Sequence, residues 1–166
     1  MRLVSAAVLL LVASAAAAQQ QPPAVGCAAP IARQFDFWAG HWEVRGAGGQ
    51  LLGHNTIEVV EDGCVVLENW RGARGATGRS FNFVENGEWH QVWVANNPNG
   101  ALRLKGGLQD GAMVMRGTVV NRQGATVHNR ITWTPLENGD VRQLWETSTD
   151  GSTWQTVFDG RYVKLK

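Results

Sequence analysis

The sequence predicts an all-β protein whose strands form a single antiparallel up-and-down barrel of about ten strands, preceded by a short helical turn. Turn-forming residues recur about every 12 positions, and the segments between them are rich in Val, Thr, Ile, Trp and Phe. No stretch of ten or more residues keeps the apolar period of an amphipathic helix. Closure into a barrel removes exposed sheet edges, and short hairpin turns favour a barrel over a sandwich.

Nine turn signals separate ten predicted strands. They include Asn86-Gly87, Asp110-Gly111 and Asn138-Gly139, which are dipeptides preferred in two-residue hairpin turns. The helical turn is expected at residues 31–38. A barrel of this size holds either packed side chains or one small ligand. The predicted strands cover residues 41–45, 51–60, 64–71, 79–85, 88–94, 101–107, 112–120, 126–135, 141–148 and 153–163.

The first 18 residues have the pattern of a secretory signal peptide. Arg2 supplies a positive charge, an apolar run follows, and small residues end at Ala18, where we expect cleavage. The apolar run is shorter than the about 20 residues that a membrane span needs. The remaining 148 residues suit one domain, with a flexible lead-in at 19–30 and the barrel at 31–166. We therefore predict a periplasmic or secreted bacterial protein that is not an integral membrane protein.

The two cysteines, Cys27 and Cys64, are expected to form a disulfide, because an isolated pair in an oxidising compartment usually does so and no C-x-x-C spacing is present. The alternative is a lipid anchor on Cys27, since residues 24–27 loosely resemble a lipobox. Five residues, 19–23, separate that segment from the apolar run that a lipobox should close directly. The formal net charge is +1 without a basic cluster, so nucleic acid is not a predicted partner.

Several motifs together resemble a family of secreted bacterial lipocalin-like proteins to which no activity has been assigned. The resemblance covers nearly the whole chain after the signal peptide and implies a calycin-type β-barrel, similar to lipocalins and fatty-acid-binding proteins. It is carried by the segments FDFWAGHWEV at 35–44, GCVVLENW at 63–70, SFNF at 80–83, WHQVW at 89–93, VRQLWE at 141–146 and DGSTW at 150–154.

The segment from Trp38 to Trp42 is also similar, more distantly, to the opening of the haem-binding ten-stranded barrels of the nitrobindin type. Those barrels hold haem through a histidine late in the chain. No histidine follows His128 in this sequence, and we predict no cofactor.

Hairpin register sorts the side chains into two faces, because a two-residue turn fixes the pairing. The Asp110-Gly111 hairpin has one apolar face and one charged face. The Asn86-Gly87 hairpin places Ser80 and Trp89 with Asn82, Gln91 and Trp93, opposite a Phe/Val face. The same reasoning at Asn138-Gly139 groups Arg130 with Gln143 and Trp145.

Two interpretations of these faces are open. In one, the Phe/Val face forms an ordinary core and the Trp/amide face lies outside. In the other, which we favour, the Trp/amide face lines a polar and aromatic cavity, and residues 27–40 or a second subunit cover the outer Phe/Val face. The second interpretation predicts that a small ligand is bound by Asn82, Gln91, Trp93, Arg130, Gln143, Trp145 and Glu68.

Charged residues inside apolar strands are a further open point. In one arrangement, Glu68, Arg142 and Glu146 form solvent-facing ion pairs that add little to stability. In the other, they lie inside the barrel and bind a ligand or one another. The solvent-facing arrangement is the commoner one.

No catalytic residue and no metal site is predicted. The four histidines fall on four separate strands without metal-binding spacing, and no G-x-S-x-G motif is present. Nothing in the sequence positions Glu68 and Glu146 as a hydrolytic pair. The leading hypothesis is a small-molecule binding barrel. The alternatives are an interaction module that docks a protein, a glycan or a second copy through a Trp-bearing outer face, and an enzyme acting inside the barrel.

Overall fold

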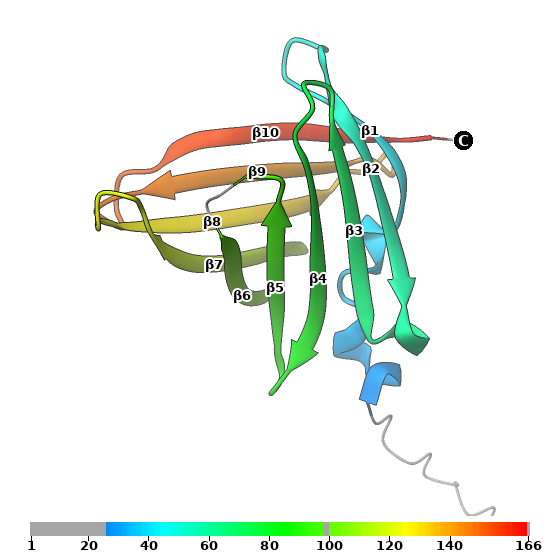
Figure 1. Ribbon diagram of the computed structural model, residues 1–166. Helices are drawn as coiled ribbons and strands as arrows, with labels where there is room; N and C mark the ends of the chain where they lie inside the picture. Colours follow the sequence, from blue (N-terminus) through cyan, green and yellow to red (C-terminus); the bar gives the residue numbers. More distant parts are fainter. Residues whose placement is uncertain (1–25, 98–99, 166) are drawn as a thin grey trace, which may run out of the picture.

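The computed structural model describes residues 26–97 and 100–165, so the expected signal peptide lies outside the described residues. Ten strands form one closed barrel in which each strand pairs antiparallel with its sequence neighbours, and β1 (Gly40–Arg45) closes against β10 (Gln155–Lys164) (Figure 1). This confirms the predicted fold class. The strands between them are β2 (Leu51–Val60), β3 (Val65–Gly72), β4 (Thr77–Glu85), β5 (Glu88–Ala95), β6 (Ala101–Gln109), β7 (Ala112–Val120), β8 (Thr126–Pro135) and β9 (Val141–Ser148).

Two tight turns set the register of the middle strands. Asn86, Gly87, Asp110 and Gly111 all have positive φ, as both central residues of a type I′ turn require. The turns pair Asn82 with Gln91 on β4 and β5, and Gly106 with Met115 on β6 and β7. These are the pairings expected from the sequence.

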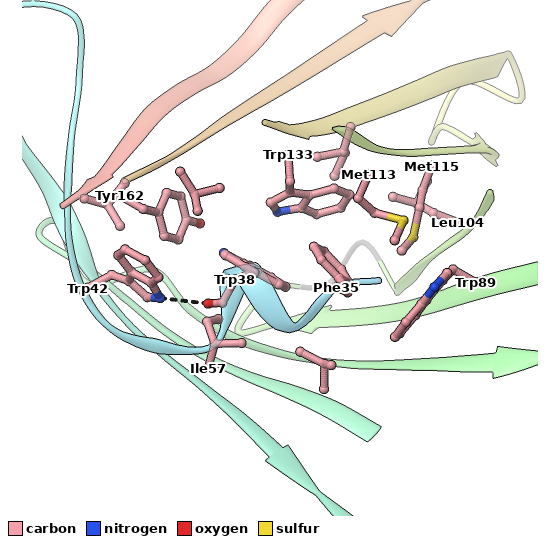
Figure 2. Packing of buried hydrophobic residues seen from close by; sticks show 14 of the residues in the cluster. Phe35, Trp38, Trp42, Ile57, Trp89, Leu104, Met113, Met115, Trp133 and Tyr162 are labelled. Carbon is pink, nitrogen blue, oxygen red and sulfur yellow. Dashed lines mark hydrogen bonds between the residues drawn. The ribbon is translucent and has the colours of Figure 1, made fainter. Parts of the chain in front are cut away.

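The N-terminal segment closes one end of the barrel. Residues 26–38, which we call the N-terminal plug, form three 3-10 turns: η1 (Gly26–Ala28), η2 (Pro30–Arg33) and η3 (Asp36–Trp38). The last two account for the helical turn expected at 31–38. Phe35 and Trp38 are fully buried, and the Phe35 ring lies 5.2 Å from that of Trp133 (Figure 2). Aromatic rings at this separation bury a large area and fill the end of the barrel.

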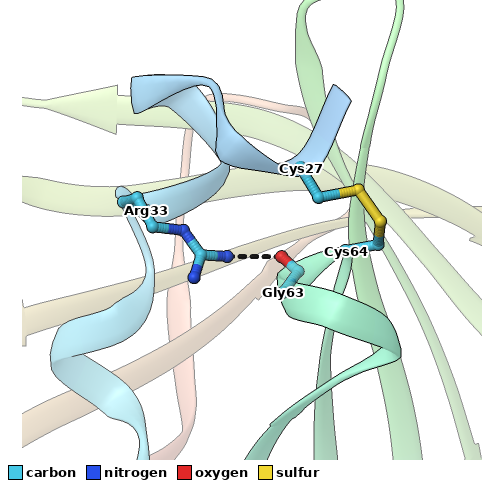
Figure 3. Close-up of a disulfide and its surroundings, with 4 residues drawn as sticks. All are labelled: Cys27, Arg33, Gly63 and Cys64. Atoms are coloured by element: carbon cyan, nitrogen blue, oxygen red, sulfur yellow. Dashed lines mark hydrogen bonds between the residues drawn. A yellow bond between two sulfur atoms is a disulfide. The ribbon is translucent and has the colours of Figure 1, made fainter. Parts of the chain in front are cut away.

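A disulfide ties the plug to the barrel. Cys27 of η1 is bonded to Cys64, which follows η4 (Glu61–Gly63) in the β2–β3 connection, with a Cα–Cα distance of 4.7 Å (Figure 3). The Arg33 guanidinium donates a hydrogen bond to the Gly63 carbonyl beside it. The predicted disulfide is confirmed, and a lipid anchor on Cys27 is wrong because its sulfur is taken up in the bond.

The β8–β9 connection departs from the expected two-residue turn. Pro135 pairs with Val141, so the loop spans five residues, 136–140, and the Leu136 N–H donates to the Asp140 carbonyl at 2.8 Å. Compared with the expected two-residue turn, the five-residue loop shifts the pairing of β8 with β9 by one position. This shift places every side chain of one strand on the opposite face from the one expected relative to its neighbour. Arg130 therefore pairs with Glu146, and Ile131 pairs with Trp145.

Candidate ligand-binding cavity

The barrel contains a cavity of about 570 Å³ that opens at the end opposite the N-terminal plug. Its mouth is formed by residues of the β1–β2 and β3–β4 turns, and its inner end lies at the level of Glu68 in the middle of β3. The volume falls within the range of small-molecule sites in proteins. The lining consists of Gln50, Leu51, Leu52, Glu68, Trp70, Gly72, Arg74, Ala76, Gln91, Trp93, Leu102, Ile131, Gln143, Trp145, Phe158 and Tyr162.

Several large aromatic rings form part of the wall. Trp70 of β3 and Phe158 of β10 meet edge to face, with their ring centroids 6.0 Å apart. Glycines on neighbouring strands make room for the indoles: a Cβ on Gly53 would lie 2.7 Å from the Trp70 ring, and a Cβ on Gly78 would overlap the ring of Trp93. The wall is therefore shaped by the pairing of a large residue on one strand with glycine on the next.

A buried carboxyl group stands at the inner end of the cavity. Glu68 is 5% exposed and accepts hydrogen bonds from Asn55 Nδ2 and Ser80 Oγ, both at 2.7 Å. These partners come from the two strands that flank β3. Ser80 lies directly opposite Glu68 on β4, and Asn55 lies on β2, two residues before Ile57, which is opposite Glu68 there. Among the described residues, no Lys, Arg or His forms an ion pair with Glu68. Buried carboxyl groups are normally paired with a cation, so this arrangement is unusual.

Neutral polar groups extend from Glu68 along the interior. The Tyr162 hydroxyl accepts a hydrogen bond from Asn55 Nδ2 at 3.2 Å and donates one to Gln143 Oε1. On the other side, Gln91 Nε2 donates to Asn82 Oδ1 at 2.7 Å. Each amide is held in one orientation by its partner, so the polar end of the cavity is pre-organised.

Burial shifts the protonation of two of these groups. Removal from water raises the pKa of Glu68 to about 7, and the hydrogen bonds from Asn55 and Ser80 oppose this rise only in part. Burial, together with the nearby charge of Glu68, holds the pKa of Tyr162 well above its ordinary value of 10. Tyr162 is therefore a neutral hydroxyl, whereas Glu68 changes its charge near neutral pH.

The structure brings most of the predicted site residues together. Glu68, Gln91, Trp93, Gln143 and Trp145 all line the cavity. Asn82 is fully buried directly behind this lining, where it orients Gln91.

The Trp/amide face thus lies inside the barrel, and the interpretation that placed the Phe/Val face inside is wrong. Phe81 and Val94 are each 53% exposed on the outer surface. The prediction that residues 27–40 cover this outer face is also wrong, because the plug closes the end of the barrel and leaves Phe81 exposed. Trp89 and Trp93 point inward, so neither belongs to an outer face that could dock a partner.

Arg130 is the predicted site residue that the structure places elsewhere. The one-residue shift at the β8–β9 loop turns it to the outer surface, where Arg130 Nη2 lies 2.9 Å from Glu146 Oε2 and the guanidinium packs over the Trp154 ring. Arg142 is likewise outside and pairs with Asp159 at 2.7 Å. The solvent-facing interpretation is therefore correct for Arg142 and Glu146 and wrong for Glu68.

Several residues were not predicted for the site. Trp70, Phe158 and Tyr162 line the cavity, and Asn55 and Ser80 donate hydrogen bonds to Glu68. The alternation of Trp70 with Glu68 on one strand was a usable signal for Trp70, because residues two apart share a face. No comparable signal was present for Phe158 and Tyr162, since irregular pairing in the first half of β10 obscures its faces.

Within residues 26–97 and 100–165, no cluster of three or more His, Cys, Asp or Glu side chains could hold a metal ion. No described helix is both long and apolar enough to cross a membrane. In comparisons with known proteins, no protein-family model and no curated protein sequence matches the chain.

Proposed function

We propose that the protein is a binding barrel for a small molecule that enters through the open end and is held among the tryptophans. The observation that carries this proposal is the cavity of about 570 Å³, closed at one end by the plug and open at the other. A merely structural barrel would be expected to fill this volume with side chains, because interiors are packed without large voids.

The chemistry of the lining supports a ligand that combines a flat or apolar body with a polar group. Trp70, Trp93 and Trp145 offer apolar surface along the cavity, and Glu68 with Gln143 offers hydrogen bonding at its inner end. Binding sites for small molecules combine such walls with a few placed polar groups.

We further propose that the protein works in the periplasm or outside the cell and belongs with the secreted lipocalin-like barrels that its motifs resemble. The disulfide between Cys27 and Cys64 supports an oxidising compartment. The pattern of residues 1–18 supports export.

Titration with N-phenyl-1-naphthylamine, a neutral apolar dye whose emission rises in apolar surroundings, tests the binding function. We expect saturable binding that Trp93→Ala weakens about tenfold, since a lost aromatic wall costs roughly 1–2 kcal/mol. Trp154→Ala is the matched control, because Trp154 lies outside the barrel against Arg130. Equal weakening by both variants, or no saturable binding, would argue against a ligand inside the barrel.

A second candidate function is self-association through the outer face of β3 to β5. Leu67, Phe81 and Val92 are register neighbours across these strands, and Phe81 is 53% exposed. Exposed apolar patches often mark interfaces. Sedimentation velocity is the test: a dimer that Phe81→Ser converts to monomer supports this candidate, and a monomer at all concentrations removes it.

A further inference from the structure

The charge of the cavity is concentrated at its inner end. Of the described residues that line it, Glu68 is the one acid, and the single base is Arg74, an exposed residue in the β3–β4 turn at the mouth. The side chains that contact or face Glu68 from β2, β4, β5, β9 and β10 are Asn55, Ser80, Gln91, Gln143 and Tyr162. Only Tyr162 among these five can titrate, and it stays neutral. None of the residues that the structure describes therefore supplies a cation to balance an ionised Glu68.

Aromatic rings surround the space in front of this carboxyl group. Trp70, Trp93, Trp145 and Phe158 line the same cavity. The faces of such rings carry partial negative charge and attract organic cations, most strongly where water is excluded. A carboxylate at the end of an aromatic enclosure is therefore complementary to an ammonium group joined to an apolar body.

We propose that the cavity binds an organic ammonium ligand, a protonated amine or a quaternary ammonium, with Glu68 as its counterion and the tryptophans around its apolar part. This assignment rests on the proposed binding function and names the class of its ligand. Asn55 and Ser80 act as positioning residues, because each donates a hydrogen bond to one Glu68 oxygen and holds the carboxylate toward the cavity.

The pH dependence of binding distinguishes an ammonium ligand from a neutral ligand, because it follows the protonation of Glu68. Burial raises the pKa of Glu68 to about 7, so the carboxylate that a cation requires becomes populated as the pH rises through neutrality. An ammonium ligand whose own charge is fixed must then bind more tightly at pH 8 than at pH 6. A neutral ligand that accepts a hydrogen bond from protonated Glu68 must show the opposite dependence.

The test uses benzyltrimethylammonium, which is permanently charged, and its neutral isostere neopentylbenzene, both followed by quenching of tryptophan fluorescence in the full chain. We expect the wild-type protein to prefer the cation by at least about tenfold at pH 8, with the preference shrinking as the pH falls to 6. Glu68→Gln should reduce the preference to what the aromatic rings alone provide, and it should abolish the pH dependence. Glu146→Gln is the matched control, because it removes the same charge from the outer surface.

The results distinguish the ammonium assignment from the more general proposal of a binding barrel. Equal or tighter binding of neopentylbenzene by the wild-type protein overturns the ammonium assignment and leaves the binding barrel standing. Binding of neither probe, together with no saturable uptake of N-phenyl-1-naphthylamine, overturns both proposals. Uptake of the dye without binding of benzyltrimethylammonium overturns the ammonium assignment alone. The pH titration of the wild-type protein reports the role of Glu68 even if Glu68→Gln fails to fold.

Discussion

Replacing Glu68 with Gln should change how the stability of the protein depends on pH. The folded-state pKa of Glu68 is about 7, against 4.5 for an unperturbed glutamate. Below pH 4.5 the side chain is protonated in both the folded and the unfolded chain, and it has no effect on the pH dependence. Between pH 4.5 and 7 the unfolded chain releases this proton while the folded chain keeps it, so stability falls as the pH rises.

The size of the effect follows from the two pKa values. Their difference is about 2.5, and at about 1.36 kcal/mol for each pKa unit this amounts to about 3 kcal/mol. No large discount for solvent screening is needed, because the side chain is 5% exposed. The wild-type protein should therefore lose about 3 kcal/mol of unfolding free energy from this group as the pH rises to 7 and beyond. Glu68→Gln should lack this loss.

Urea unfolding followed by tryptophan fluorescence, at a series of pH values from about 4 to about 8, measures this difference. Subtracting the wild-type curve from the Glu68→Gln curve cancels the contributions of the histidines and surface acids that both proteins share. Glu146→Gln should track the wild type, because Glu146 lies in an ion pair on the outer surface. Parallel curves for the wild type and Glu68→Gln would refute the view that Glu68 is buried without a counterion.

Three further perturbations test other parts of the structure. Reducing the disulfide, or replacing Cys27 and Cys64 with Ser, removes a link across 37 residues. This change should lower the unfolding free energy by about 4 kcal/mol. An unchanged melting temperature in dithiothreitol would contradict this expectation. Trp38→Ala removes a fully buried ring from the plug and should cost about 3–5 kcal/mol in urea unfolding, whereas Trp154→Ala on the outer surface should cost clearly less. Arg130→Ala should leave dye affinity unchanged in fluorescence titrations, and a loss of affinity would return Arg130 to the binding site.

The fold could be predicted because its information is local. Turn dipeptides such as Asn86-Gly87 and Asp110-Gly111 mark the hairpins, and the two-residue alternation between them marks the faces. Where the turn had the expected length, the faces of Asn82, Gln91 and Trp93 were assigned correctly.

The remaining site residues depended on geometry that the sequence does not display. The Asn138-Gly139 dipeptide sits inside a five-residue loop, and this difference moved Arg130 from the cavity to the surface. Bulges interrupt the pairing of β1 with β2 and of β9 with β10, so no local turn signal assigned Asn55 or Tyr162 to the interior. The hydrogen bond between Asn55 and Tyr162 joins strands far apart in the chain, and only barrel closure brings those two residues together.

Native mass spectrometry of the protein purified from the cells that naturally make it is the most direct test of the binding function. We expect a stoichiometric extra mass that denaturation releases, from a compound that is small enough for a cavity of about 570 Å³ and carries an ammonium group. Protein that is purified from those cells without an extra mass, and that also fails to take up N-phenyl-1-naphthylamine in solution, would contradict a barrel that is built around a ligand.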